Sequence, residues 1–384
     1  MPLGLLWLMA TACAVCVASG YYNQPLLGDF AATFHVPPWQ AALVATAAQV
    51  GYGCGLLFFL PLGDLVERRR LVVVLVAACA ASLVLTAAAP NLPVLILGNL
   101  LVGLTAISAQ ILIPLGADMV PAAERGRLVG TLMAGLLCGI LLARVFAGLV
   151  ADHFGWRAVF GTGAVLMAVL GAALHFNLPR HRADISLAYW PLMRTLLGLW
   201  AGQPVLRSAS VVSALSFASF IAFWTSLSFL MADHFGLGAS AAGMFGLVGV
   251  IGAAAAPLAG RMTDRRGFGF TVAVALAITA ASFVLMSAWV TLVGLVVGVL
   301  LMDLGVQSVQ VAAQAKVISL VPEARSRLNT VYMVSRFTGG AAGSALGAIA
   351  WSWGKWTGVG AFCLLANGAA LLVHYLGVRR HGGR

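Results

Sequence analysis

Long apolar stretches follow one another through almost the whole 384-residue chain, and charged residues are the main interruptions between them. Only 9% of the residues are charged and 61% are hydrophobic, whereas a soluble domain carries about 25% charged residues. No soluble fold can bury that much apolar surface. A helix needs about 20 apolar residues to cross the ~30 Å hydrocarbon layer, so the chain has room for roughly a dozen spans. The sequence therefore predicts an all-α integral membrane protein.

We predict twelve transmembrane helices, arranged as two pseudo-symmetric halves of six helices each. A β-barrel would need strands of ~10 residues with alternating polarity, and the long runs of Ala, Val, Leu and Gly lack that alternation. The halves are expected at residues 1–179 and 207–384, with a linker at 180–206. The expected spans are 5–28, 40–62, 71–89, 94–116, 128–150, 157–178, 207–231, 240–262, 269–287, 291–317, 329–351 and 357–378.

Lys and Arg are concentrated in every second connection between the expected spans. Of the 22 basic residues, only Arg157 and Lys355 fall on the opposite side, and Arg144 and Arg336 fall inside spans. Positively charged loops remain in the cytoplasm, so both termini are expected to be cytoplasmic. The net charge of +11 then reflects topology and attraction to anionic membrane lipids, and a nucleic-acid partner is not expected.

The cysteines and the known catalytic motifs give no sign of an enzyme or of a metal site. All six cysteines lie within expected spans, where Cys behaves as a small hydrophobic residue. Cys13 and Cys16 have C-x-x-C spacing, but they lack the soluble strand-helix context of a redox motif. The chain has no G-x-S-x-G, H-E-x-x-H or P-loop sequence. We therefore expect no enzymatic activity, no metal and no cofactor.

Two motifs recur in order in the two halves, about 200 residues apart. The segment 63–70 reads GDLVERRR, and 260–267 reads GRMTDRRG. Farther along each half, VPAAERGR ends at Arg127 and VPEARSR ends at Arg327. This internal repeat predicts two halves that share one design.

The first of these motifs resembles the signature of the major facilitator superfamily, G-x-x-x-D-R-x-G-[RK]-[RK]. Glu67 stands at the acidic position in place of Asp, and Arg70 stands at the second Gly. The resemblance covers essentially the whole chain and implies secondary transport by alternating access, with a site near the midplane between the halves. The residues that carry it are Gly63, Glu67, Arg68, Arg69 and Arg70 in the first half and Gly260, Asp264 and Arg265 in the second.

Both copies of this motif place an acid beside arginines, next to helix ends. Such a contact can form on one side of the membrane and break when the halves rock, so we expect a gating latch here. The alternative is that the arginines only set the topology. The second acid favours the latch, because topology alone would not require it.

Two further segments resemble the exporter branch of the family. Residues Gly135, Gly139 and Gly148 follow its glycine-rich pattern around G-P-x-x-G-G, with Arg144 at the proline position. AERGR and YYNQPLL are similar to segments of bacterial drug and metabolite exporters. The resemblance implies proton-coupled efflux of a small organic solute across a bacterial inner membrane by a monomer, with the proton gradient as the energy source.

Three charged residues fall inside the apolar spans, where each costs about 2.5–3.5 kcal/mol and usually faces a partner or a watery cavity. Asp303 lies twelve residues past Thr291 and Arg336 eight past Leu328, so helix rise places both at about the same depth. We therefore predict an ion pair or shared cavity for them, with Asp303 as the proton-coupling group. A permanent structural salt bridge is the alternative. Arg144 falls in the outer third, where snorkelling to the interface would be open to it.

Neutral polar residues at similar depth are candidates for lining a substrate cavity. In the resembled fold the first, fourth, seventh and tenth spans face such a cavity, but a polar side chain there can equally bond to a neighbouring helix. The substrate-binding candidates are Arg336, Arg144, Asn23, Gln24, Asn99, Gln110, Gln307 and Gln310. Asn99 stands where the family's R-x-x-Q-G segment has Arg.

Glycines and the linker complete the expected design. Glycines of the second, eighth and eleventh spans are expected to let helices approach and slide at the seam between the halves, with static packing as the alternative. They are Gly51, Gly53, Gly55, Gly243, Gly246, Gly249, Gly252, Gly339, Gly340, Gly343 and Gly347. Residues 184–201 mix apolar residues with Trp190 and Trp200, which suits an amphipathic helix in the membrane interface.

The leading functional hypothesis is proton-coupled efflux. The alternative is proton-coupled uptake of a small organic anion, because protonation of Asp303 would free Arg336 to hold an anion. A channel is disfavoured because no filter-like motif is present, and an intramembrane enzyme because no catalytic constellation is.

Overall fold

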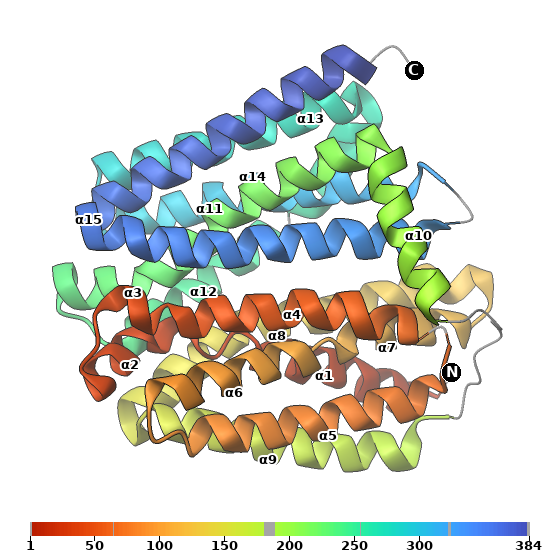
Figure 1. The fold of residues 1–384 in the computed structure, drawn as a ribbon, viewed down its shortest axis with the longest axis horizontal. Helices are drawn as coiled ribbons and strands as arrows, with labels where there is room; N and C mark the ends of the chain where they lie inside the picture. The colour runs from red at the N-terminus through yellow and green to blue at the C-terminus, as the bar shows by residue number, and fades with distance from the viewer. Residues whose placement is uncertain (1, 64, 180–188, 254, 322–323, 382–384) are drawn as a thin grey trace.

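The computed structural model describes residues 2–63, 65–179, 189–253, 255–321 and 324–381, and every regular element in these ranges is a helix (Figure 1). The helices are α1 (Leu3–Ser19), η1 (Gln24–Leu26), α2 (Leu27–Phe34), α3 (Pro38–Ala41), α4 (Leu43–Leu62), α5 (Arg68–Ala87), α6 (Leu92–Thr105), α7 (Ser108–Asp118), α8 (Ala122–Phe154), α9 (Trp156–Asn177), α10 (Tyr189–Gly202), α11 (Pro204–Phe235), α12 (Ala239–Ala253), α13 (Ala255–Ala288), α14 (Leu292–Ile318) and α15 (Arg325–His381).

Ten helical segments of the described ranges are long and apolar enough to cross a membrane. The longest, Arg325–Arg379, has non-helical backbone at Gly354 and Lys355, between the expected spans 329–351 and 357–378. The expected span 240–262 falls on α12 and the start of α13, and its residue 254 lies outside the described residues. The all-helical membrane architecture is confirmed, and the count of twelve stays a prediction.

The helices form two bundles that lie side by side. Figure 1 shows α1 to α9 in the lower part of the molecule and α11, α13, α14 and α15 in the upper part. Helix α12, which we group with the upper bundle, packs on α14 and, across the seam, on α8. The first helix begins and the last helix ends at the same end of the molecule, where α10 runs between the bundles. The connections that are rich in Lys and Arg in the sequence belong to this end of the molecule.

Glycine contacts explain how equivalent helices pack in the two bundles. Gly139 of α8 lies against the backbone of Ala14 in α1, so closely that a Cβ would collide there. Gly339 of α15 lies in the same way against the backbone of Ala214 in α11. Small residues of this kind let two helix backbones approach without a side chain between them. The two contacts are 200 residues apart in the chain, so the repeat seen in the motifs extends to the packing.

Only part of the glycine pattern lies at the seam between the bundles. Gly243 and Gly246 of α12 face Arg144 of α8, and Gly53 of α4 faces Phe337 of α15, as expected. Its neighbour Gly51 instead faces Leu100 of α6 within the same bundle. Residues two apart on a helix point in different directions, so one glycine-rich segment serves both contacts.

The linker contributes one amphipathic helix, α10. Leu192 and Leu196 are buried, whereas Trp190 and Leu197 are exposed. The Tyr189 hydroxyl donates a hydrogen bond to the Phe58 carbonyl oxygen, 3.1 Å away, and so ties α10 to α4. Residues 184–188 of the expected interfacial segment lie outside the described residues.

Candidate functional site

A cavity of about 550 Å³ lies between the two bundles. It is walled by α1, α4, α7 and α8 on one side and by α11, α14 and α15 on the other. The volume falls within the usual range for small-molecule sites, about 300–1,000 Å³. The cavity therefore has the size and the central position expected of a transport site.

The cavity opens at the end of the molecule where the chain termini lie. Its mouth is lined by Leu60, Ala117 and Ile318, at the ends of α4, α7 and α14, and by the exposed residues Arg325 and Ser326 at the start of α15. The deep wall is formed by aromatic side chains and Arg336. A solute can thus reach the middle of the molecule from one side.

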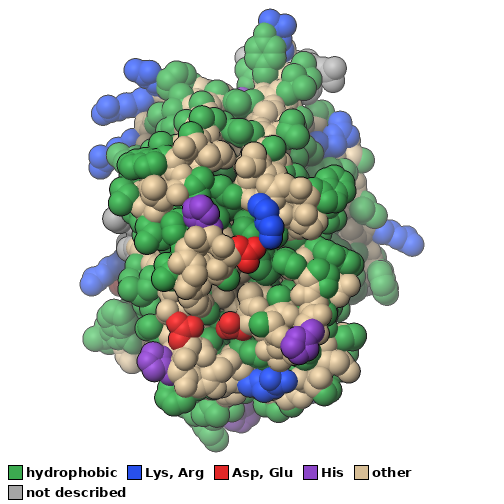
Figure 2. Space-filling model, turned by 90° about the vertical axis from the view of Figure 1, so that its left-hand side faces the viewer, with side chains coloured by type: hydrophobic (Ala, Val, Ile, Leu, Met, Phe, Trp, Pro, Cys, Tyr) green, Lys and Arg blue, Asp and Glu red, His purple; other side chains and the backbone are tan. Residues whose placement is uncertain are grey.

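The bundles are in contact at the opposite end, which faces the viewer in Figure 2. The backbone N–H of Ser240, at the start of α12, donates to Oδ2 of Asp152 on α8 at 3.2 Å. Nearby, Gly148 of α8 lies against the backbone of Ala239. The Ser344 hydroxyl donates to the carbonyl oxygen of Ala42 at 3.5 Å, joining α15 to the start of α4. These contacts close the end that the cavity does not reach.

Arg336 is the buried cation of the cavity. The side chain is 4% exposed, and Cζ of its guanidinium lies 4.0 Å from the centroid of the Phe217 ring. Nη1 donates a hydrogen bond to the Ser213 hydroxyl at 3.2 Å. Since a guanidinium has five N–H donors, most of its hydrogen-bonding capacity is available to a solute.

The predicted pairing of Asp303 with Arg336 is wrong in this structure. Within the described residues, Arg336 makes no ion pair with Asp303, and the electrostatic partner of Asp303 is Arg144 on α8. The position of a residue along a span gives its depth in the membrane, but it does not give the rotation of the helix about its axis, which decides the neighbours of the side chain. Arg336 and Asp303 are at similar depth but have different neighbours.

Asp303 is buried outside the cavity wall. The side chain is 4% exposed, and Oδ2 has no hydrogen-bond partner among the described residues. It lies against Gly249 of α12, where an added Cβ would be 2.9 Å from Oδ2. Gln307, one helical turn farther along α14, does line the cavity. Asp303 therefore lies one turn beyond the solute-accessible surface.

Arg144 is also buried, which corrects the expectation that it could snorkel to the interface. The side chain is 2% exposed, and its Nε donates to Oε1 of Gln24 at 2.8 Å. Cζ lies 3.8 Å from the Trp224 ring and 5.2 Å from the Tyr21 ring. Nη2 has no hydrogen-bond partner among the described residues. Arg144 thus carries a spare donor in a closed part of the protein.

Tyr21 stands between the two arginines. It lines the cavity and is in electrostatic contact with Arg144 and Arg336. The structure therefore contains an open compartment with Arg336 and a closed compartment with Arg144 and Asp303, with Tyr21 at the boundary.

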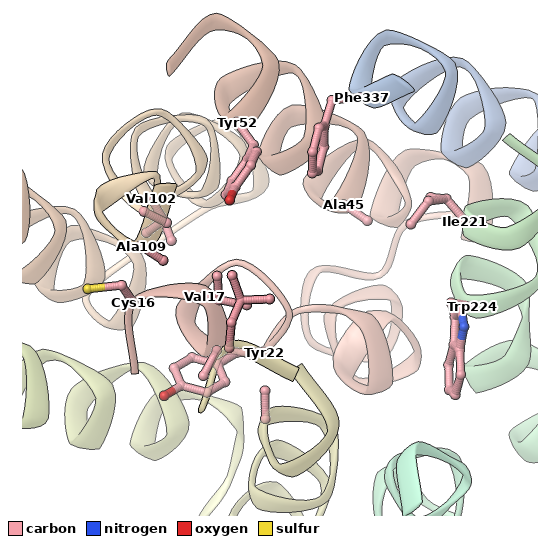
Figure 3. Close-up of a cluster of buried hydrophobic side chains, with 14 of the residues drawn as sticks. Cys16, Val17, Tyr22, Ala45, Tyr52, Val102, Ala109, Ile221, Trp224 and Phe337 are labelled. Carbon is pink, nitrogen blue, oxygen red and sulfur yellow. The ribbon is translucent and has the colours of Figure 1, made fainter. Parts of the chain in front are cut away.

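Amide and aromatic side chains complete the cavity wall. Gln307 and Gln310 of α14 line it, as does Gln110, whose Nε2 donates to the Tyr52 hydroxyl at 3.4 Å. The Tyr52 and Phe337 rings lie 4.3 Å apart between centroids, across the seam between α4 and α15 (Figure 3). In addition to Arg336, three predicted substrate-binding residues therefore line the cavity: Gln110, Gln307 and Gln310.

The other predicted candidates lie elsewhere. Asn23 Nδ2 donates to Oδ1 of Asn99 at 3.1 Å, and both side chains are buried away from the cavity. Gln24 holds Arg144, as described above. These residues bond helices or orient a charge. The prediction missed Ser213 and Phe217, which contact Arg336, and Trp224, which contacts Arg144. All three lie on α11, and their helical spacing was the available signal.

Two arginines of the signature loop between α4 and α5 bond to residues of their own bundle. Arg68 donates to Asp118 Oδ2 at 2.7 Å and, through Nε, to the carbonyl oxygen of Gly63 at 3.0 Å. Arg69 donates to the carbonyl oxygen of His175. Glu67 directly precedes α5, and its side chain makes no capping hydrogen bond there.

In the second copy of the motif, Asp264 and Arg265 are exposed on α13 near Gly260, at the open end of the molecule. The gating role of both motif copies stays a prediction.

A family model described as "Major Facilitator Superfamily" matches residues 8–344 and 209–384, which together span most of the chain. The chain belongs to the Major Facilitator Superfamily. As a member of this superfamily it is a multi-pass membrane transporter and not an enzyme.

Similar proteins support this assignment along the whole chain. The "Uncharacterized transporter YgaY" of Escherichia coli O157:H7 is 41% identical over 383 residues, covering 98% of this chain and 96% of that protein. The "Probable transporter SCO4007" of Streptomyces coelicolor is 37% identical over 355 residues, covering 90% and 82%.

A solved structure of a bacterial homologue of the human lysosomal transporter Spinster, in an inward-facing and unoccupied conformation, has the same fold. Its TM-score is 0.76 at 15% identity, with 97% of this chain and 96% of that chain covered.

Proposed function

We propose that this transporter couples the movement of a small organic anion to the movement of a proton. The observation that carries the proposal is the buried guanidinium of Arg336 in the cavity wall, which makes one hydrogen bond to the part of the protein that the structure describes. A carboxylate can accept the remaining guanidinium donors in charge-assisted hydrogen bonds, which are stronger than neutral ones.

The charges of the cavity wall favour an anion over a cation. Arg336 and Arg325 both line the cavity, and no acidic residue appears among its described lining residues. Asp303 lies behind this wall. An organic cation entering from the open end would therefore meet two positive charges before it could reach a carboxylate, whereas an anion would meet its counter-charges first.

The closed compartment provides a route to coupling. While Asp303 is ionised, it neutralises Arg144 electrostatically. A proton on Asp303 removes that counter-charge, so the charge of Arg144 adds to the positive potential at the cavity wall, where Tyr21 is in electrostatic contact with both Arg144 and Arg336. Binding of the proton then strengthens binding of the anion, and linkage requires the reverse as well. A proton and an anion that favour each other travel in the same direction.

Charge distribution also supports an orientation. Because basic loops remain in the cytoplasm, the end with the termini and the cavity mouth is assigned to the cytoplasmic side. The cavity is then open inward, and the contact between Ser240 and Asp152 closes the outside. Similarity to proteins of Escherichia coli and Streptomyces coelicolor supports a bacterial inner membrane. In this proposal the protein works as a monomer, with the proton gradient as its energy source.

Proton-coupled efflux is the second candidate function. It is favoured by the glycine-rich α8, which resembles the exporter pattern and uses Gly139 and Gly148 for close helix contacts. In this scheme a solute and a proton would compete for the closed compartment and travel in opposite directions. Arg144 stands at the proline position of that pattern, beside Asp303, which favours anion coupling over the exchange of a cation.

Proteoliposomes loaded with a pH-sensitive dye test the proposal. Inward gradients of a panel of organic carboxylates and of organic ammonium ions are applied, with protein-free vesicles as the control for passive permeation of weak acids. Acidification of the lumen by carboxylates, above that control, is the expected result. Alkalinisation driven by ammonium ions, without a response to any carboxylate, would replace the proposal with antiport.

A further inference from the structure

We infer that the transported anion is a flat aromatic carboxylate, with its carboxylate on Arg336 and its ring against the aromatic wall of the cavity. The inference rests on the proposed function, because it names the class of anion that the same site would accept. Four features of the cavity support it: the arrangement of its rings, the shape of the opposite wall, the geometry of Arg336 and the position of its amides.

The aromatic wall adjoins Arg336 directly. Phe337 follows it in α15, and the Phe217 ring lies beneath its guanidinium. The Phe217 ring is edge-on to Phe337, with centroids 5.5 Å apart, and stacked on Phe220 at 5.6 Å with an interplanar angle of 15°. Figure 3 shows Tyr52 facing Phe337 from the other bundle. A ring attached to a carboxylate on Arg336 would therefore lie within reach of these rings.

The opposite wall is aliphatic. It consists of side chains of α8, namely Val129, Met133, Leu136, Leu137 and Ile140, all of which line the cavity. An aromatic face on one side and aliphatic and thioether groups on the other suit a flat apolar solute, since methionine adapts its shape and packs well against rings. A strongly hydrated, compact anion would leave both walls without a partner.

Arg336 presents a planar donor edge. Its Cζ lies 4.0 Å from the Phe217 ring centroid, and Ser213 takes one donor of Nη1. The remaining donors match the two oxygens of a carboxylate in a bidentate contact. This arrangement explains why the site would recognise a carboxylate and not only a negative charge.

Amides provide room for a polar substituent on the ring. Gln307 and Gln310 of α14 line the cavity and have no hydrogen-bonding partner for their side chains among the described residues. Gln110 is engaged with Tyr52, and Gln314 with Asn329, where Nε2 donates at 2.8 Å. The two free amides could therefore bind a hydroxyl or carbonyl group of the solute.

The test compares three matched probes on purified protein by calorimetric binding. These are 2-naphthoate, its saturated counterpart decahydronaphthalene-2-carboxylate, and the neutral 2-naphthamide. We expect the aromatic acid to bind about 5-fold more tightly than the saturated acid, because aromatic contacts contribute beyond buried area. We expect it to bind at least about 10-fold more tightly than the amide, because the hydrogen bonds to Arg336 are charge-assisted.

Two variants assign each preference to its residue. Phe337→Leu should reduce the preference for the aromatic acid over the saturated acid to about parity while the preference for acid over amide persists. Arg336→Gln should remove the preference for acid over amide while the preference for the aromatic acid over the saturated acid persists. Phe176→Leu, on the exposed surface of α9, and Arg207→Gln, outside the cavity, are the matched controls and should behave as wild type.

The outcomes separate this inference from the proposed function. Equal binding of the aromatic and saturated acids, each tighter than the amide, overturns the aromatic assignment and leaves organic-anion transport standing. Tighter binding of the amide than of both acids overturns both. Absence of saturable binding by the aromatic acid also overturns the inference, and the carboxylate panel in proteoliposomes then decides the proposed function independently.

Discussion

Arg144 of α8 and Asp303 of α14 are electrostatic partners that belong to different bundles, although no hydrogen bond joins them. Both side chains pack on the glycine face of α12, where Gly246 lies against Arg144 and Gly249 against Asp303. Each also has a terminal atom without a hydrogen-bond partner among the described residues. A pair of this kind can be separated by a movement of the bundles at little cost in hydrogen bonds, and it is the natural point for coupling a proton to that movement.

The first prediction is that Arg144 and Asp303 are energetically coupled while Arg336 and Asp303 are not. Loss of one partner leaves an uncompensated buried charge, so Arg144→Gln and Asp303→Asn should each destabilise the protein. The double variant should differ from additivity by about 0.5–3 kcal/mol. The free energy of unfolding in detergent is measured for the wild type, the two single variants and the double variant.

The matched cycle combines Arg336→Gln with Asp303→Asn. It should be additive within about 0.5 kcal/mol, because the two residues are not paired. A larger coupling in this second cycle than in the first would restore the pairing that depth alone suggests.

The second prediction concerns proton coupling. Asp303→Asn keeps the size of the side chain but cannot exchange a proton, so net anion-driven acidification should be lost. Anion exchange across the membrane without net proton movement should remain, because Arg336 is untouched. Counterflow of a labelled aromatic carboxylate in proteoliposomes, beside the pH signal, distinguishes the two. Asp233→Asn, at the exposed end of α11, is the control; a retained pH signal in Asp303→Asn would remove Asp303 from the coupling mechanism.

Hydropathy and the repeat of two motifs were sufficient to predict the architecture. Apolar length identifies the spans because only a helix satisfies its own backbone in lipid, and GDLVERRR and GRMTDRRG relate the two bundles. The burial of Asp303 and Arg336 also followed from their position inside apolar runs. These features depend on position along the chain, which the sequence gives directly.

The partners of the buried charges depend on the rotation of each helix about its axis. The spans have nearly uniform apolarity, so the sequence has little periodic signal to fix that rotation. The hypothesis for Arg336 failed for this reason, since α15 turns it toward Phe217 and Ser213. Arg144 was placed near the interface because the rings against it, Tyr21 and Trp224, belong to distant segments of the chain.

A third prediction follows for the two asparagines that were candidates for substrate contact. Asn23 and Asn99 hydrogen-bond to each other in a closed part of the first bundle. Asn99→Leu should lower stability by about 1–3 kcal/mol, because the amide of Asn23 loses its acceptor. Adding Asn23→Leu should recover part of this loss. Thermal unfolding measures the stability. The relative affinities for 2-naphthoate, its saturated counterpart and 2-naphthamide should stay unchanged, and a change in them would place these residues at the substrate.

The last prediction concerns the closed end of the molecule. Gly243 of α12 lies against the backbone of Arg144, so a Cβ there would force α12 away from α8. Backbone cannot give way as a flexible side chain can, so Gly243→Ala should weaken the closed outer contact and increase the share of outward-open molecules. Ser240→Cys, at the start of α12, reports this change through its rate of modification by a membrane-impermeant maleimide. The rate should rise several-fold, about the effect of a 1 kcal/mol shift in the equilibrium. Gly161→Ala on α9 adds the same methyl group where nothing lies within 4 Å, and it should leave the rate unchanged. An unchanged rate in Gly243→Ala, with the variant folded, would mean that α8 and α12 do not separate when the outer end opens, and the contact of Arg144 with Asp303 would then have to persist through the transport cycle.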